Sequence, residues 1–379
     1  MRMETLAVKS GLEPDDASKA IAPPITLSTT FERGEDGSYP GGFDYSRSGN
    51  PNRKALEAAL AALEGGAEAV AFPSGMAATF SVIFSLSPGD HVLAADDAYY
   101  GTGVLLREQF AERGIEATFV DMAELGAVRA AMRPNTRLVW METPSNPLIR
   151  VSDIEAIAGI ARDGGALSCC DNTWATPLLQ RPLELGADLV MHSTTKYFGG
   201  HSDVTGGAVI VREPGEALDA LRKIQTDGGL IPSPFDAWLT RRGLESLAPR
   251  MAMHCANALE LARFLDAHPG VARVHYPGLE DDPGHRLASR QMSDFGGMLA
   301  FDVVGGRDEA FAVAAAVKII ARATSLGGTH SLIEHRASIE GPTTRAPENL
   351  LRMSVGLEHP EDLKEDLARA LAHGVRQGH

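Results

Sequence analysis

The segment "HSTTKYFGGHSDV" contains a single lysine, Lys196, among residues that could take part in catalysis. Ser193 precedes it at the S-x-x-K spacing, which in one class of acylating enzymes marks a serine nucleophile with a lysine beside it. Those enzymes also need S-D-N and K-T-G elements, whereas here Ser202-Asp203 is followed by Val204 and no K-T-G occurs. A serine acylase is therefore not favoured, and Lys196 needs partners elsewhere in the chain.

Three other segments place polar residues at the ends of strand-like runs. Ser74-Gly75-Met76 lies between "EAVAF" and a helical run, "ETPSNP" follows "RLVWM", and Asp171 ends "ALSCCD". In open α/β sheets, ligands bind beyond the carboxyl ends of the strands. We therefore expect a helix N-terminus, an amide, a carboxylate, hydroxyls and Lys196 to meet at one sheet edge.

These groups together indicate one cofactor. A helix N-terminus and hydroxyls suit a phosphate. A carboxylate suits a cationic ring nitrogen, and a lysine suits a carbonyl that can form an imine. Pyridoxal 5′-phosphate (PLP) needs all three. Asp171 would keep the ring nitrogen protonated, and Lys196, released by the substrate amine, would act as a general base at the substrate Cα.

Composition excludes several other classes of function. The formal net charge of −15 argues against nucleic acid or an anionic membrane as the partner. No apolar run reaches the roughly 18 to 20 residues of a membrane span, and the N-terminus lacks a signal-peptide core. The three cysteines include no C-x-x-C, and neither H-E-x-x-H nor a G-x-G-x-x-G after a strand occurs. We expect a cytoplasmic enzyme with a small-molecule substrate and no metal.

The elements that would position these residues alternate along the chain. Residues 50–65 predict a helix capped by Asn50, with Pro51 in the first turn and Gly65 at its end. In residues 151–165, Ser152 and Glu155 have capping-box spacing. Short apolar runs predict strands buried on both faces, at 68–72, 91–95, 117–121, 136–142, 165–171, 188–194 and 206–212. This alternation predicts an α/β fold, a mostly parallel central sheet with helices on both faces.

The pattern changes near Pro232 and Pro234, where a long helical stretch begins. We place a domain boundary there. The predicted division is an N-terminal extended arm over residues 1–47, a large cofactor-binding domain over 48–235 and a smaller α+β C-terminal domain over 236–379.

The segment "DNTWATPLLQRPLELGADLVMHSTTKYFGGHSD" resembles the signature of the Cys/Met-metabolism family of PLP-dependent enzymes. The resemblance extends over nearly the whole chain, through "APPITLSTTF", "FDYSRSGNP", "FPSGMAA", "ETPSNP", "SLGG" and "RMSVGLE". It implies the PLP-dependent transferase fold type I, which is aspartate-aminotransferase-like. It also implies a homotetramer built from catalytic dimers.

The resemblance further implies roles for single residues around the cofactor. Lys196 would hold the cofactor covalently and shuttle protons, Asp171 would pair with the ring nitrogen, and Tyr99 would stack on the ring and act on the leaving group. Asn146 would lie near the phenolic oxygen. The phosphate would be bound by Gly75, Met76, Ser193 and Thr195 and, from the neighbouring subunit, by Tyr45 and Arg47.

On the substrate side, the resemblance implies that Arg352 binds the substrate carboxylate, with Ser325, Thr324 and Asn146 beside it. Here the chain departs from its relatives. Thr324 stands where related γ-lyases and γ-synthases often have a glutamate that helps recognise the distal amino group of cystathionine. Gly101 replaces the cysteine typical of methionine γ-lyases, and Tyr100 stands where glycine is common.

From this resemblance we expect a transsulfuration enzyme acting at a γ-carbon, with cystathionine γ-lyase as the leading hypothesis. The alternatives within the family are cystathionine γ-synthase, β-lyase, methionine γ-lyase and O-acetylhomoserine sulfhydrylase. A non-catalytic regulator with the PLP fold is the alternative from another class. The sequence does not decide which substrate the enzyme uses, or whether it catalyses an elimination or a replacement.

Overall fold

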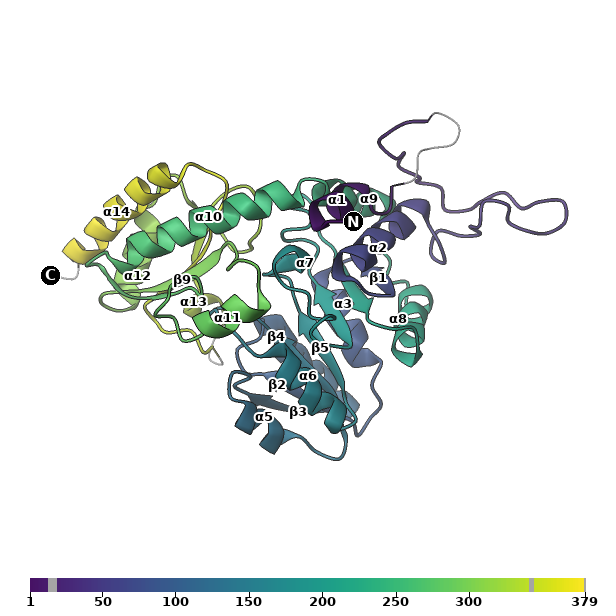
Figure 1. Cartoon of the computed structure of the whole chain (residues 1–379), viewed down its shortest axis with the longest axis horizontal. Coiled ribbons are helices and arrows are strands. Elements are labelled where there is room, and N and C mark those ends of the chain that lie inside the picture. Colours follow the sequence, from purple (N-terminus) through teal and green to yellow (C-terminus); the bar gives the residue numbers. More distant parts are fainter. Residues whose placement is uncertain (13–18, 341–343, 378–379) are drawn as a thin grey trace.

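A computed structural model describes residues 1–12, 19–340 and 344–377 and contains two sheets (Figure 1). All pairings in the larger sheet are parallel except those of β7, which runs antiparallel to both neighbours. The mostly parallel sheet is therefore confirmed. Its strands, in spatial order, are β1 (Glu68–Phe72), β7 (Gly207–Val211), β6 (Leu189–His192), β5 (Leu167–Asp171), β4 (Thr136–Glu142), β2 (His91–Ala95) and β3 (Glu116–Val120).

Helices cover both faces of this sheet, as predicted. On one face, apolar side chains of β4, β5 and β7 pack against α2 (Pro51–Glu64) and α6 (Ile154–Asp163), with α5 (Leu125–Ala131) beside them. On the other face, Trp140 and its neighbours pack against α3 (Gly75–Phe84), α8 (Glu216–Asp227) and a π-helical turn at Leu105–Phe110. Shorter helical segments are α4 (Tyr100–Val104), η2 (Ala111–Arg113) and α7 (Thr176–Leu179).

The ends of α2 and α6 show whether the capping residues predicted from the sequence are correct. The Asn50 side chain accepts hydrogen bonds from the backbone N–H groups of Asn52 and Arg53, and Gly65 ends α2 at a positive φ of 72°, so both predicted signals are confirmed. The predicted capping box of Ser152 is wrong. Asp153 caps α6 by accepting from the Ala156 N–H, because the N–H of Ser152 is bonded to the Thr143 hydroxyl in the preceding loop.

The smaller sheet has the spatial order β10 (Ala321–Arg322), β11 (Leu332–His335), β12 (Leu350–Ser354), β9 (Met298–Val303) and β8 (Val271–His275). It packs against a layer that contains α10 (Leu247–Asp266), α12 (Arg307–Ala316) and α14 (Pro360–Gln377) through a separate apolar core. The remaining elements are α9 (Pro234–Leu244), α11 (His285–Gln291) and α13 (Ala337–Glu340). Although α10 and α14 are long, no helix in the described ranges is apolar enough to cross a membrane.

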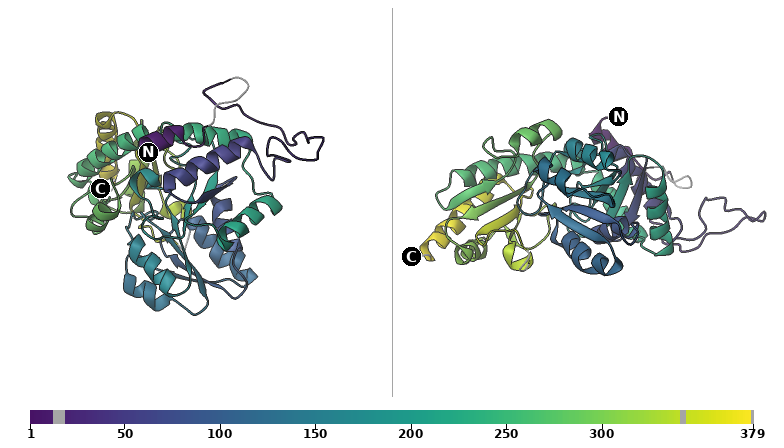
Figure 2. Two further views of the ribbon diagram at one scale, coloured as in Figure 1. Left: turned by 45° about the vertical axis from the view of Figure 1, so that its right-hand side comes forward. Right: turned by 90° about the horizontal axis from the view of Figure 1, so that it is seen from below.

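The N-terminal segment is not extended throughout. Helix α1 (Met3–Lys9) packs against α2 and α10. Residues 19–47 project from the body as a long loop (Figures 1 and 2). Its base is held where the Trp238 indole donates to the Pro23 carbonyl and the Asn52 amide donates to the Pro24 carbonyl.

Candidate active site

A cavity of about 460 Å³ lies where strands of the large sheet end, and the segments 324–326, 336–339 and Arg352 of the C-terminal part close its other side. Every site residue predicted from the sequence lines this cavity except Tyr45 and Arg47. The lining includes Gly75, Met76, Tyr99, Asn146, Asp171, Ser193, Thr195, Lys196, Thr324, Ser325 and Arg352.

One end of the cavity is suited to an anion. The Ser74 hydroxyl caps α3 by accepting from the Ala77 N–H at 3.0 Å. The N–H groups of Gly75 and Met76 stand in the first turn, where no intrahelical acceptor exists. A Cβ at Gly75 would lie 2.7 Å from that of Ser193, so only glycine allows this close approach. The Thr195 hydroxyl accepts from the Gly206 N–H at 3.0 Å and lies 3.2 Å from the Gly206 carbonyl.

Two carboxyl groups lie at the ends of neighbouring strands. Asp171 on β5 pairs in parallel register with Glu142 on β4, and both are buried. Burial raises the pKa of the Asp171 carboxyl, although hydrogen bonds from Thr173 act against this shift. Burial, and then the negative charge of Asp171, raise the pKa of Glu142 well above its usual range. A cation bound beside Asp171 would therefore stabilise its charged form.

Lys196 is held beside the C-terminal part of the chain. Its ammonium donates to the Ser325 hydroxyl at 2.8 Å. Burial, followed by the positive charge of Arg352, lowers the pKa of Lys196 to about 8. Ser325 has a φ of +89°, a conformation that costs a non-glycine residue about 1–3 kcal/mol and is typical of functional sites. The amine is thus close to the neutral form that a nucleophile or base requires.

Arg352 occupies a buried position on β12. It donates to the Asn146 side-chain oxygen at 2.8 Å and to the Ser325 carbonyl at 3.3 Å, and it forms an ion pair with Glu334. Its guanidinium carbon lies 5.8 Å from the centre of the Trp174 ring. Burial lowers the pKa of Arg352 to about 10, so it stays charged at neutral pH and can bind a carboxylate.

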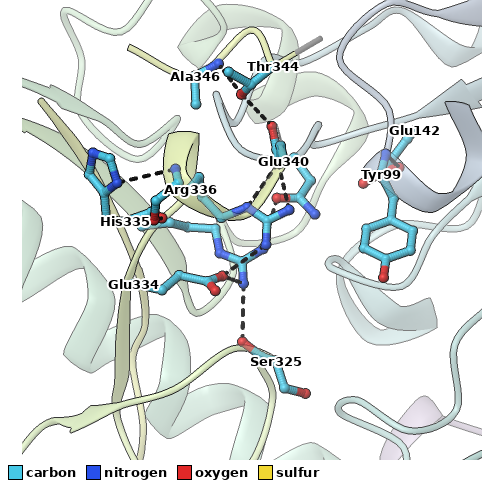
Figure 3. A network of polar contacts seen from close by, with 12 residues as sticks. Tyr99, Glu142, Ser325, Glu334, His335, Arg336, Glu340, Thr344 and Ala346 are labelled. Atoms are coloured by element: carbon cyan, nitrogen blue, oxygen red, sulfur yellow. Dashed lines mark hydrogen bonds and ion pairs between the residues drawn. The ribbon is translucent and has the colours of Figure 1, made fainter. Parts of the chain in front are cut away.

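Sequence reasoning missed three charged residues that extend from Arg352 (Figure 3). Arg336 donates to Glu334 at 3.2 Å and, through two nitrogens, to Glu340 at 2.5 and 2.9 Å. We call Arg352, Glu334, Arg336 and Glu340 the charge network. All four are at least 93% buried. The signal was present in "EHRASIE", where opposite charges occur two and four residues apart.

Tyr99 lies at the mouth of the cavity with 42% of its surface exposed. Its backbone N–H donates to the Glu142 carboxyl at 2.6 Å, a role for Glu142 that sequence reasoning missed. A Cβ at position 101 would lie 2.7 Å from the Tyr99 ring and 2.8 Å from the Met76 sulfur. Gly101 therefore leaves room for the ring.

Tyr45 and Arg47 lie outside the cavity of their own chain. They belong to the projecting N-terminal segment, where Arg47 donates to the Thr226 carbonyl at 3.0 Å and lies over the Tyr45 ring. Their assignment to a neighbouring subunit's phosphate stays a prediction.

The cavity residues fit PLP. The helix N-terminus at Gly75 provides an anion site, Asp171 is a buried carboxylate that a cation would stabilise, and Lys196 is an amine with a lowered pKa.

Comparison with known proteins gives the family. The profile of the "Cys/Met metabolism PLP-dependent enzyme" family matches residues 4–372. The cystathionine gamma-synthase of Mycobacterium tuberculosis (strain H37Rv) is 49% identical over 374 residues, covering 97% of this chain and 96% of that protein. The cystathionine gamma-lyase of Bacillus subtilis is 42% identical over 379 residues, covering 98% and 99%.

A crystal structure of cystathionine gamma synthase from Xanthomonas oryzae pv. oryzae, in complex with aminoacrylate and cysteine, matches with a TM-score of 0.95 and 41% identity over 99% of both chains. The expected fold type I architecture is thereby confirmed. The chain belongs to the Cys/Met-metabolism family of PLP-dependent enzymes.

Proposed function

We propose that the protein is a cystathionine γ-synthase, which joins the sulfur of cysteine to Cγ of an O-acyl-L-homoserine and releases the acyl group as a carboxylic acid. Similarity to known enzymes carries this choice over the γ-lyase expected from the sequence. The chain is 49% identical to the cystathionine gamma-synthase of Mycobacterium tuberculosis and 42% identical to the cystathionine gamma-lyase of Bacillus subtilis.

We assign the chemistry to residues of this chain as follows. Bound PLP would supply the electron sink that lets Cα and then Cβ of the substrate lose protons. Arg352 would hold the substrate carboxylate, and Asp171 would lie against the cofactor's ring nitrogen. Lys196, held by Ser325, would remove the Cα proton. Tyr99 would stack on the cofactor and assist departure of the acyl group from Cγ.

The assembly and location of the enzyme belong to the same proposal. The projecting segment carries exposed apolar side chains, among them Ile21 and Leu27 at 93% and 70% exposure, which a neighbouring subunit would cover. We propose the homotetramer implied by the family, in which Tyr45 and Arg47 reach the neighbour's phosphate site. We also propose a cytoplasmic location and the three-part division at residues 47 and 235.

A product assay tests the proposed reaction. The purified holoenzyme is mixed with O-acetyl-L-homoserine and cysteine, and separately with cystathionine alone, and the products are identified by mass spectrometry. Cystathionine should form in the first mixture with the larger kcat/KM. Faster release of cysteine, 2-oxobutanoate and ammonia from cystathionine would instead show a γ-lyase. Pyruvate with homocysteine would show a β-lyase.

The lowered pKa of Lys196 predicts how cofactor uptake depends on pH. Only the neutral amine can attack the PLP carbonyl, and its fraction rises as the pH passes through the pKa of about 8. The uptake rate of the apoprotein should therefore rise about tenfold between pH 7 and 9 and then level off. Stopped-flow absorbance measures this rate. A rate that kept rising about tenfold per pH unit beyond pH 9 would indicate an ordinary lysine.

Two substitutions of Glu142 are expected to differ in their effect on kcat/KM. Glu142→Ala leaves the Tyr99 N–H without its acceptor, and we expect kcat/KM to fall by about tenfold. Glu142→Gln keeps an oxygen acceptor of the same length and should retain most activity. Steady-state kinetics of both variants, with circular dichroism as a folding control, check this contrast. Equal losses in both variants would mean that the carboxyl acts by more than holding Tyr99.

A further inference from the structure

We propose that Asp97 is a positioning residue for the substrate's α-carboxylate, because it fixes the loop that holds Asn146 against Arg352. Asp97 is buried just after β2 and is not among the residues that line the cavity. The inference rests on the carboxylate-binding role of Arg352 in the proposed function. It does not depend on which reaction of the family the enzyme catalyses.

Two hydrogen bonds join Asp97 to the loop that follows β4. The Ser145 hydroxyl donates to the Asp97 carboxylate at 2.5 Å, and the Asn146 N–H donates to the Asp97 carbonyl at 3.2 Å. The Asn146 side-chain oxygen in turn accepts from Arg352 at 2.8 Å. A single residue, Asn146, thus separates Asp97 from the guanidinium that would bind the carboxylate.

The donor and the acceptor in the bond between Ser145 and Asp97 are fixed. The Ser145 oxygen accepts from the Arg150 N–H at 3.0 Å, which leaves its one proton for Asp97. Burial raises the pKa of Asp97 to about 6, although the Ser145 hydroxyl and then Arg150 act against this shift. Asp97 is therefore charged at neutral pH, and a hydrogen bond to a charged acceptor is stronger than one between neutral groups.

The loop needs such an anchor because part of it is strained. Ile149 has a φ of +58°, a left-handed conformation in which a β-branched residue is an outlier. Its N–H donates to the Ser145 carbonyl at 3.1 Å, and the Ser145 N–H donates to the Arg150 carbonyl at 2.9 Å. Strained backbone persists only where its surroundings hold it. Ser145 holds this turn from within, and Asp97 ties Ser145 to the end of β2.

Titration with two amines tests the proposal. L-Norvaline has the α-amine and α-carboxylate of a substrate but no leaving group at Cγ, and butylamine is the same molecule without the carboxylate. Each is added to the holoenzyme of wild type and of Asp97→Ala, and the visible absorbance of the cofactor reports binding. We expect the Kd of norvaline to rise about tenfold in the variant and that of butylamine to change by less than about twofold. An unchanged Kd for norvaline, or an equal rise for both amines, would overturn the proposal.

Three further variants make the test specific. Asp97→Asn keeps an oxygen acceptor for the Ser145 hydroxyl and should bind norvaline within about threefold of wild type. Ser145→Ala removes the same bond from its other side, and the double variant with Asp97→Ala should bind no more weakly than Ser145→Ala alone. Asp96→Ala removes a neighbouring carboxyl that contacts Arg150 and Arg345 instead, and it should leave the Kd unchanged. Additive losses in the double variant, or an equal loss in Asp96→Ala, would contradict the role of Asp97.

Arg352→Ala separates the role of Asp97 from the proposed function. It should weaken the binding of norvaline and spare butylamine. If norvaline bound Arg352→Ala as it binds wild type, the proposed carboxylate site would be wrong, and the role of Asp97 with it. If Arg352→Ala behaved as expected and Asp97→Ala bound norvaline like wild type, only the role of Asp97 would be wrong. Neither result needs turnover, so both are independent of the product assay for a γ-synthase.

Discussion

Lys196→Ala is expected to lower kcat by at least about 10³-fold, because it removes both the group that binds the cofactor covalently and the base for the Cα proton. The visible absorption band of lysine-bound PLP should also vanish. Lys196→Arg is the matched control, since arginine keeps a positive charge near Ser325 but is a poor nucleophile and base. Absorbance spectra and steady-state kinetics of both variants measure these effects.

A folding control separates chemistry from stability in this experiment. The Lys196 ammonium has one hydrogen bond to Ser325, so both variants should keep the far-ultraviolet circular dichroism of the wild type. If Lys196→Ala retained a tenth of the wild-type kcat, or kept the visible band, the assignment of Lys196 would be wrong.

Arg352→Ala should have the second large effect, on activity and stability together. Loss of the proposed carboxylate partner should lower kcat/KM by about 10²- to 10³-fold. The same change leaves the buried Glu334 carboxylate with Arg336 as its remaining partner in the charge network, which should lower the free energy of unfolding by about 3 kcal/mol. Urea denaturation and kinetics with O-acetylhomoserine measure the two effects.

The double variant Arg352→Ala/Glu334→Gln separates the two effects. Removing the uncompensated charge should restore part of the lost stability, whereas activity should stay low because the carboxylate partner is still missing. A double variant with restored activity would contradict the role proposed for Arg352. An unchanged stability in the single variant would contradict the energetic role of the ion pair with Glu334.

Much of this architecture could be predicted from local patterns. Asn50, Pro51 and Gly65 set the ends of α2 through short-range bonds and backbone geometry, and the apolar runs matched the strands of the large sheet. Ligands bind beyond the carboxyl ends of the strands in open α/β sheets, and this rule correctly predicted that Asp171, Lys196 and the helix start at Gly75 line one cavity. Such features depend on residues close in sequence or on general rules of sheet topology.

Two of the missed features depend on contacts between distant segments. The Tyr99 N–H meets Glu142 across 43 positions, and Arg352 meets Asn146 across 206. The cap of α6 is Asp153 because the Ser152 N–H is bonded to Thr143, nine positions earlier in the preceding loop. No periodicity or spacing in the sequence encodes which distant partner a polar group will find.

The charge network also constrains how this family member can diverge. Two arginines and two glutamates balance one another in a buried region. Loss of any one of these charged side chains therefore leaves an uncompensated buried charge, which destabilises the fold. A lineage that acquires a new substrate by altering these positions must therefore change them in pairs, or pass through a less stable intermediate. The exposed positions 324 and 339 carry no such penalty, and they are where new specificities can arise by single substitutions.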